Sequence, residues 1–302
     1  MSSGTTTRSR WSGPRLSLLV AALPLVTIAQ APTPPVHIAG NLYYVGDTDL
    51  AAFLVVTPKG DILINSGFEY SVKEIRERMK TLGFRLTDIK ILLATHAHSD
   101  HVAAMATIKR LTGARMLAIE QEKELLETGG KTDYLFGSAA WFPPVKVDQT
   151  FKDGGKIELG GSTLTAYLTP GHTKGSTSYT MNLTENGREY HVLIANLPVL
   201  NEGTVLIKNP KYPGIVDDYA RTFDVLRQLP CDIYLTSHAG QFGLRAKFHP
   251  GQPYSPDTFV DPYGLPRILS RLENEFGMEL DEQEQEAQAI EDRKHFKDVI
   301  PN

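Results

Sequence analysis

The sequence has almost no cysteine, since Cys231 is the single one among 302 residues. A chain with one cysteine forms no intramolecular disulfide, so the hydrophobic core must hold the fold, aided by metal if the chain binds one. Cys231 follows Leu229-Pro230 and precedes the apolar run 233–235, which favours a small buried apolar residue over a nucleophile.

The sequence also lacks runs rich in lysine and arginine, and its formal net charge is −4. Proteins that bind nucleic acids neutralise phosphates with clustered basic side chains. Nucleic acid is therefore a poor candidate partner, and a nuclease activity is disfavoured.

No apolar run near the N-terminus is long enough to span a bilayer, because the run at residues 16–28 is too short. Arginines precede it and small residues follow it: Arg8, Arg10 and Arg15, then Ala29 and Ala31. This order is typical of a signal peptide, here residues 1–31, with a buried helix or a membrane anchor as the alternative. Its removal would change the formal net charge from −4 to −7. We expect a periplasmic or secreted protein without a stable membrane anchor.

Apolar patterns predict strands and helices from residue 36 onward. Strands are predicted at residues 36–46, 51–57, 61–64, 89–94, 116–119, 156–159, 164–168, 189–195 and 233–236. Helices are predicted at residues 71–82, 102–112, 216–228 and 266–277. Ser71 and Glu74 are expected to form a capping box. Strands in runs, followed by helices in each half, indicate an α/β fold with two sheets face to face and helices outside.

The last segment, residues 279–302, is polar, with eight acidic residues and three lysines or arginines. Its few apolar residues are scattered. We expect a loosely attached or disordered tail, with a solvated helix as the alternative.

The main functional signal is the segment Thr95-His96-Ala97-His98-Ser99-Asp100-His101, which lies between a predicted strand and a predicted helix. Imidazole nitrogens and a carboxylate oxygen are ligands that suit zinc. In an extended chain His96 and His98 point the same way and can share one metal ion. Asp100 and His101 come after the turn and can face a second ion. Ser99 is a plausible N-cap for the following helix.

Two further histidines follow predicted strands among small or polar neighbours. His172 follows Thr169-Pro170-Gly171, and His238 follows Thr236-Ser237. We interpret the other four histidines as structural or surface residues: His37, His191, His249 and His295. Five histidines in such matching positions indicate a metal site rather than chance.

These residues resemble the metallo-β-lactamase superfamily, whose motif is H-x-H-x-D-H followed by two distant histidines. The resemblance runs from about residue 40 to 276, and subclass 3 of the class B β-lactamases is most similar. The segments that carry it are Trp141 to Asp148, Pro170-Gly171-His172-Thr173, Gly175 to Ser178, Asn209-Pro210, Tyr212 to Ile215, Asp218-Tyr219 and Leu229 to His238. The resemblance implies a four-layer αβ/βα sandwich, formed by a domain at residues 32–278.

The resemblance also implies two zinc ions per chain. The first would be held by His96, His98 and His172, and the second by Asp100, His101 and His238. Three neutral imidazoles leave zinc an open position for water, whose pKa then falls to about 7. The implied activity is hydrolysis of the β-lactam amide by a zinc-bound hydroxide, which confers resistance to β-lactam antibiotics. Asp100 is the candidate catalytic residue, because it can accept a hydrogen bond from that hydroxide.

One loop departs from the family. Thioesterases of this superfamily place an aspartate that bridges both metals where this chain has Asn196-Leu197, and subclass 3 enzymes usually place a serine there. The absence of a carboxylate favours a β-lactamase, whereas the substitution leaves a lactonase or thioesterase as the alternative. Ser176, Ser178 and Asn201 are candidate donors to a substrate carboxylate, with loop and cap hydrogen bonding as the other interpretation. The substrate is expected to be a small molecule.

Overall fold

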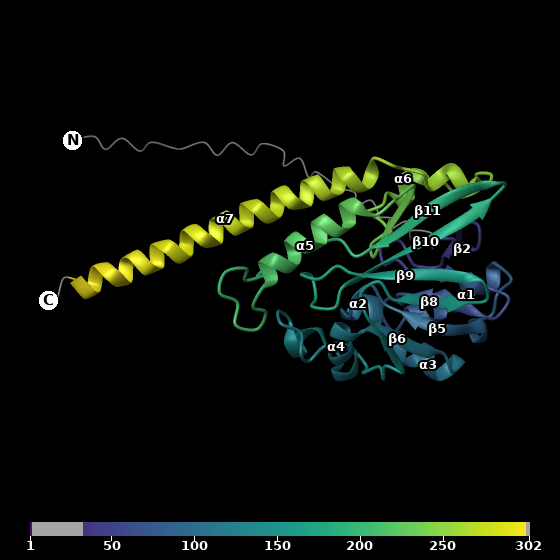
Figure 1. Ribbon diagram of the computed structural model, residues 1–302, viewed down its shortest axis with the longest axis horizontal. Coiled ribbons are helices and arrows are strands. Elements are labelled where there is room, and N and C mark those ends of the chain that lie inside the picture. Colours follow the sequence, from purple (N-terminus) through teal and green to yellow (C-terminus); the bar gives the residue numbers. More distant parts are fainter. Residues whose placement is uncertain (2–32, 300–302) are drawn as a thin grey trace. The chain divides into compact units, whose positions relative to one another are not determined.

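The computed structural model describes Met1 and residues 33–299 of the chain. Apart from Met1, the predicted signal peptide lies outside the described residues. Within the described part, strands form two sheets (Figure 1). The first has the order β1-β2-β3-β4-β5-β6-β7. Its strands are β1 (Val36–Ala39), β2 (Leu42–Tyr44), β3 (Phe53–Val55), β4 (Asp61–Ile64), β5 (Ile89–Leu93), β6 (Arg115–Ile119) and β7 (Gln149–Phe151).

The second sheet has the order β12-β11-β10-β9-β8. Its strands are β8 (Lys156–Leu159), β9 (Ser162–Leu168), β10 (Thr177–Glu185), β11 (Arg188–Ala195) and β12 (Ile233–Thr236). Strands β4 to β7 pair in parallel, as do β11 and β12, so several strands end at the same edge of their sheet. Loops at that edge are positioned by rigid strands.

Helices flank both sheets (Figure 1). They are α1 (Ser71–Thr81), α2 (Ser99–Val102), α3 (Met105–Thr112), α4 (Lys123–Thr128), α5 (Ile215–Gln228), α6 (Leu244–Lys247) and α7 (Gly264–Val299). Short 3-10 helices are η1 (Leu86–Asp88), η2 (Glu120–Glu122), η3 (Gly137–Ala140) and η4 (Pro256–Phe259). Figure 1 shows α5 and α7 beside the second sheet, and α3 and α4 beside the first. No helix in the described part is long and apolar enough to cross a membrane.

Alternating side chains of the first sheet enter two separate cores. Along β4, Ile62 and Ile64 belong to the core shared with the second sheet, whereas Leu63 packs toward α1 and α3. All three side chains are fully buried, and burying one such side chain stabilises the fold by roughly 1.5–3 kcal/mol. The first sheet is therefore apolar on both faces. With α5 and α7 covering the second sheet, the layers are helix, sheet, sheet, helix, which is the predicted αβ/βα sandwich.

Several local predictions were wrong. Residues 36–46 form the hairpin of β1 and β2 instead of one strand, because Gly40 turns the chain with a φ of 53°. The structure contains β10 and β7, which we did not predict. Ser71 does not cap α1, since its Oγ has no hydrogen-bond partner. Ser99 is the first residue of α2 and not its cap, which is His98.

The last helix is longer than predicted. We expected it to end at Gly277, but α7 continues to Val299. Residues 279–299 are therefore helical, as the alternative prediction of a solvated helix stated. Gln283 holds this part of α7 against the loop that follows Thr204: its amide donates to the carbonyl oxygen of Thr204 (2.8 Å) and accepts from the backbone nitrogen of Leu206 (2.7 Å).

Candidate metal centre

Loops from both sheets meet at one edge of the fold. The chain leaves β5 and reaches Thr95 and His96, and it leaves β12 and reaches Ser237 and His238. The hydroxyl oxygens of Thr95 and Ser237 lie 2.8 Å apart. The backbone nitrogen of Thr177, at the start of β10, donates to the carbonyl oxygen of Thr95 at 2.7 Å. These bonds fix the ends of the two sheets against each other and bring the histidine loops together.

The first cluster consists of His96, His98 and His172. Each offers one ring nitrogen, and these three atoms lie within 4.8 Å of one another. The ring centroids of His96 and His172 are 4.5 Å apart, and those of His98 and His172 are 4.8 Å apart. All three side chains are buried. The structure thus unites residues that are 76 positions apart in the sequence and were predicted to share one ion.

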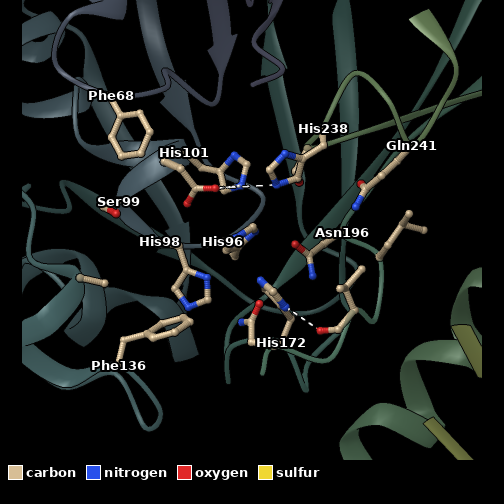
Figure 2. A pocket seen from close by; sticks show the side chains of 16 residues that line it. Phe68, His96, His98, Ser99, His101, Phe136, His172, Asn196, His238 and Gln241 are labelled. Atoms are coloured by element: carbon tan, nitrogen blue, oxygen red, sulfur yellow. Dashed lines mark hydrogen bonds and ion pairs between the residues drawn. The ribbon is translucent and has the colours of Figure 1, made fainter. Parts of the chain in front are cut away.

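The second cluster is formed by Asp100 and three imidazoles. His96, Asp100 and His101 offer ligand atoms within 4.8 Å of one another. Oδ2 of Asp100 lies 3.1 Å from Nε2 of His101 and 3.7 Å from Nε2 of His238. Figure 2 shows His101 and His238 beside each other, and their ring centroids are 5.0 Å apart. All six predicted ligands therefore converge, with His96 between the two clusters.

Three of the histidines are held by acceptors on one ring nitrogen. Nε2 of His98 lies 3.3 Å from Oδ2 of Asp133, and Nδ1 of His172 lies 2.8 Å from the carbonyl oxygen of Val199. Nδ1 of His238 lies 3.4 Å from Oδ2 of Asp49. Such partners fix the ring and its tautomer. They leave Nδ1 of His98 and Nε2 of His172 and His238 free to bind a metal.

Burial favours the neutral form of the imidazoles of His96, His101 and His172. It lowers the pKa of His172 to about 3, with neighbouring imidazoles adding to the effect. Burial and the same neighbours lower the pKa of His96 well below its usual value, and burial lowers that of His101. For Asp100, burial acts to raise the pKa, but the contact with His101 and the other imidazoles lowers it far below normal. The site therefore offers neutral nitrogens and an ionised carboxylate at neutral pH, which are the forms that bind metals.

The donor set fits zinc. Both ring nitrogens of His101 are buried and make no hydrogen bond, and its contact with Asp100 lacks hydrogen-bond geometry. Unpaired buried polar atoms are costly and call for a partner. Imidazoles with a carboxylate are typical zinc ligands.

The two clusters lie in a pocket of about 370 Å³ (Figure 2). Apolar side chains of Phe68 and Phe136 flank it, and Phe136 packs edge-on against His98. Asn196 also lines the pocket, and its Nδ2 is buried without a hydrogen-bond partner. A pocket with apolar walls and a few unpaired polar groups suits a small molecule that carries a polar reacting bond.

The predicted substrate contacts divide into two groups. Asn201 lines the pocket, but Ser176 and Ser178 do not. Both serines are fully buried: Oγ of Ser176 accepts from the backbone nitrogen of Thr173 (3.0 Å), and Oγ of Ser178 accepts from that of Asn196 (2.9 Å). These two serines therefore match the other interpretation, which was hydrogen bonding within loops. Their hydroxyls hold the segments on which His172 and Asn196 lie.

Sequence reasoning missed two acids that support the site, and Asn65 supports it as well. Asn65, with a φ of 62°, accepts a hydrogen bond from the backbone nitrogen of Thr95 at 2.9 Å. Asp133 contacts His98, and the buried Glu122 contacts the backbone of Ala97 at 2.6 Å. An asparagine before Ser-Gly was a local signal for a left-handed turn at Asn65. The two acids have no such signal, because only the folded chain brings them to the histidines.

Residues 45–184 match the Metallo-beta-lactamase superfamily. A hydroxyacylglutathione hydrolase of Pseudomonas aeruginosa is 34% identical over 96 residues, which are 32% of this chain. That match spans 28% of the length of the curated relative.

Solved structures match far more of the chain. FEZ-1 metallo-β-lactamase from Legionella gormanii is 44% identical, with 84% of this chain and 97% of that chain covered and a TM-score of 0.80. The class B3 di-zinc metallo-β-lactamase LRA-12, from an Alaskan soil metagenome, is 41% identical over 83% of this chain and 97% of that chain, also with a TM-score of 0.80. GOB-18 metallo-β-lactamase from Elizabethkingia meningoseptica is 43% identical over 83% and 93%, with a TM-score of 0.80.

Proposed function

The chain belongs to the metallo-β-lactamase superfamily and, within it, to the class B3 enzymes, and we propose that it hydrolyses β-lactam antibiotics with two zinc ions. One observation supports this most strongly: His96, His98 and His172 place ring nitrogens within 4.8 Å of one another inside a pocket that also contains Asp100, His101 and His238. The relatives of 41–44% identity that share this fold are metallo-β-lactamases.

We assign the first zinc to His96, His98 and His172, and the second to Asp100, His101 and His238. Bound zinc would supply a Lewis acid and would lower the pKa of a coordinated water molecule to about 7. LRA-12 is a di-zinc enzyme, and the contact between Asp100 and His238 supports a second site in this chain.

The chain's own residues would orient the reactants. Oδ2 of Asp100 contacts His101 and His238, which leaves Oδ1 able to accept a hydrogen bond from the attacking water molecule. The unpaired Nδ2 of Asn196 is available to donate to the carbonyl oxygen of the substrate, where negative charge develops. Asn201 also lines the pocket and can contact the substrate, and Phe68 and Phe136 can pack against its apolar groups.

The substrate class is the part of the proposal that needs a direct comparison. The match to hydroxyacylglutathione hydrolases favours a thioester as the second candidate. Against it, the segment Asn196-Leu197 contains no carboxylate where thioesterases of the superfamily have a bridging aspartate. A panel of penicillins, cephalosporins and carbapenems beside lactones and thioesters separates the two. Preferential turnover of the β-lactams supports the proposal, and turnover of thioesters or lactones alone contradicts it.

We propose that the mature protein lies in the periplasm or outside the cell. The arginines before residue 16, the apolar run at residues 16–28 and the small residues Ala29 and Ala31 after it support this location. Cell fractionation with N-terminal sequencing of the mature protein tests it.

A further inference from the structure

A buried carboxylate lies between two of the loops that hold the histidines. Glu122, at the end of η2, is 3% exposed. Its Oε1 accepts hydrogen bonds from the backbone nitrogen of Ala97 (2.6 Å) and from Oγ1 of Thr173 (2.8 Å). Its Oε2 accepts from the backbone nitrogen of Gly175 (2.9 Å). Ala97 lies on one loop, and Thr173 and Gly175 lie on another, so the side chain bridges two loops.

The positions of these donors connect Glu122 to the first cluster. Ala97 lies between His96 and His98 in the sequence, and Thr173 directly follows His172. One carboxylate therefore contacts both loops from which the three imidazoles extend. A shift of either loop relative to the other would change the separation of the ring nitrogens.

The loop after His172 also packs closely on the backbone of Glu122. A Cβ atom at position 175 would lie 2.6 Å from Cα of Glu122, so this position must be glycine. The φ angle of Gly175 is not positive. The glycine is therefore explained by the close approach of its backbone to that of Glu122 and not by an unusual backbone conformation. Backbone packing and the carboxylate thus act on the same loop.

A structural role in the core alone does not explain an acid here. Burial raises the pKa of Glu122 to about 7, although the three hydrogen bonds act to lower it. Among the described residues, Glu122 forms no ion pair with a lysine or arginine, and the nearby imidazole of His98 acts to lower its pKa. A buried acid without a cation costs stability, and an apolar residue of similar volume would cost less. This cost is consistent with a role in positioning the two loops, because one carboxylate accepts hydrogen bonds from donors on both of them.

We propose that Glu122 is a positioning residue that holds the loop at residues 96–98 against the loop at residues 172–175, and thereby sets the geometry of the first zinc site. The inference rests on the proposed zinc site and is independent of the substrate. Partners that orient metal ligands commonly change metal affinity 10- to 100-fold when they are removed.

Zinc affinity, measured without substrate, tests this inference. Purified full-length Glu122→Ala, Glu122→Gln and Thr173→Val are compared with wild type by competition with a chromophoric chelator, and circular dichroism monitors their folding. We expect zinc to bind about 10- to 100-fold more weakly to Glu122→Ala. Glu122→Gln should lose less, because its carbonyl oxygen still accepts from Ala97 and Thr173 while its amide opposes the N–H of Gly175. Thr173→Val should lose least, since it removes only one of the three hydrogen bonds that the carboxylate of Glu122 accepts.

Asp61→Asn is the matched control. Asp61 is 3% exposed, as Glu122 is, and burial raises its pKa to about 6, but it begins β4 and does not line the pocket. Its substitution should leave zinc affinity unchanged. Wild-type affinity in Glu122→Gln and Thr173→Val, or an equal loss in Asp61→Asn, overturns the inference, even if Glu122→Ala fails to fold. If the wild type binds zinc but hydrolyses no β-lactam, the proposed substrate is wrong, and the comparison of variants still decides the role of Glu122.

Discussion

Oδ2 of Asp133 lies 3.3 Å from Nε2 of His98, although 35 positions separate the two residues in the sequence. Asp133 is itself fixed, because its Oδ1 accepts hydrogen bonds from the backbone nitrogens of Leu135 (2.9 Å) and Phe136 (2.6 Å). Burial acts to raise the pKa of Asp133, but these bonds and His98 lower it below normal. An ionised acceptor thus fixes the imidazole and leaves Nδ1 for the metal.

Removing this acceptor should weaken metal binding. In Asp133→Ala the ring of His98 loses its fixed orientation, and we expect zinc affinity to fall about 10- to 100-fold. Isothermal titration with zinc measures the change. Asp88→Ala, which removes an exposed ion pair with Arg85, is the control and should bind zinc as the wild type does. Unchanged affinity in Asp133→Ala would show that the contact with His98 does not orient a ligand.

The stability of the metal-free protein should fall as the pH decreases below 6.5. The pKa of His172 is about 3 in the folded chain against an ordinary 6.5. Between these values the unfolded chain binds a proton that the folded chain does not, so acid favours unfolding. We expect a loss of about 2 kcal/mol from pH 7 to 5 for His172 alone.

Urea unfolding of metal-free protein at several pH values measures this loss. His172→Leu should show a shallower pH dependence than the wild type, whereas His249→Ala, at an exposed position, should keep the wild-type slope. Equal slopes in all three proteins would contradict the pKa assigned to His172.

Alanine at position 175 should disturb the site more than alanine at another glycine nearby. Its Cβ would collide with the backbone of Glu122, and such overpacking costs about 1–3 kcal/mol. Because His172 lies on the same loop, zinc affinity should fall as well. At Gly240, beside His238, nothing lies within 4 Å of an added Cβ, so Gly240→Ala should change neither property. Thermal unfolding and zinc titration of both variants test the difference, and equal effects would refute it.

The loop after Thr204 should loosen when α7 no longer holds it. Oε1 of Gln283 accepts from the backbone nitrogens of Leu206 (2.7 Å) and Ile207 (3.4 Å). In Gln283→Ala we expect the amide hydrogens of these two residues to exchange at least several-fold faster, since a hydrogen bond that protects them is lost. Hydrogen exchange with mass spectrometry measures the peptide that contains them. Gln288, also on α7, hydrogen-bonds to Asp292, so faster exchange in Gln288→Ala would contradict a specific role for Gln283.

Much of the fold could be predicted because its signals are local. The apolar run at β5 and the histidines after it are adjacent in the sequence, so a strand followed by a metal-binding loop was visible without coordinates. β10 was missed although its pattern is also local. Tyr179, Met181 and Leu183 alternate with polar residues and are buried, which is the pattern of a half-buried strand.

The rest of the site depends on contacts between distant segments. Glu122 and Asp133 resemble surface acids in the sequence, and only tertiary packing brings them to Ala97 and His98. The same holds for the end of α7, where Lys208 forms an ion pair with Glu291 across 83 positions. The predicted end of this helix at Gly277 rested on the sequence pattern alone, which does not contain this contact.

The central claim is that zinc held by these side chains makes the protein a β-lactamase. The most direct measurement records hydrolysis of a chromogenic cephalosporin while zinc is added back to chelator-treated, metal-free protein. We predict no hydrolysis without metal, activity that rises with zinc to two equivalents per chain, and a loss of at least about 100-fold in His172→Ala. Hydrolysis that persists after complete removal of metal, or zinc-loaded wild-type protein that leaves the cephalosporin intact, would contradict the claim.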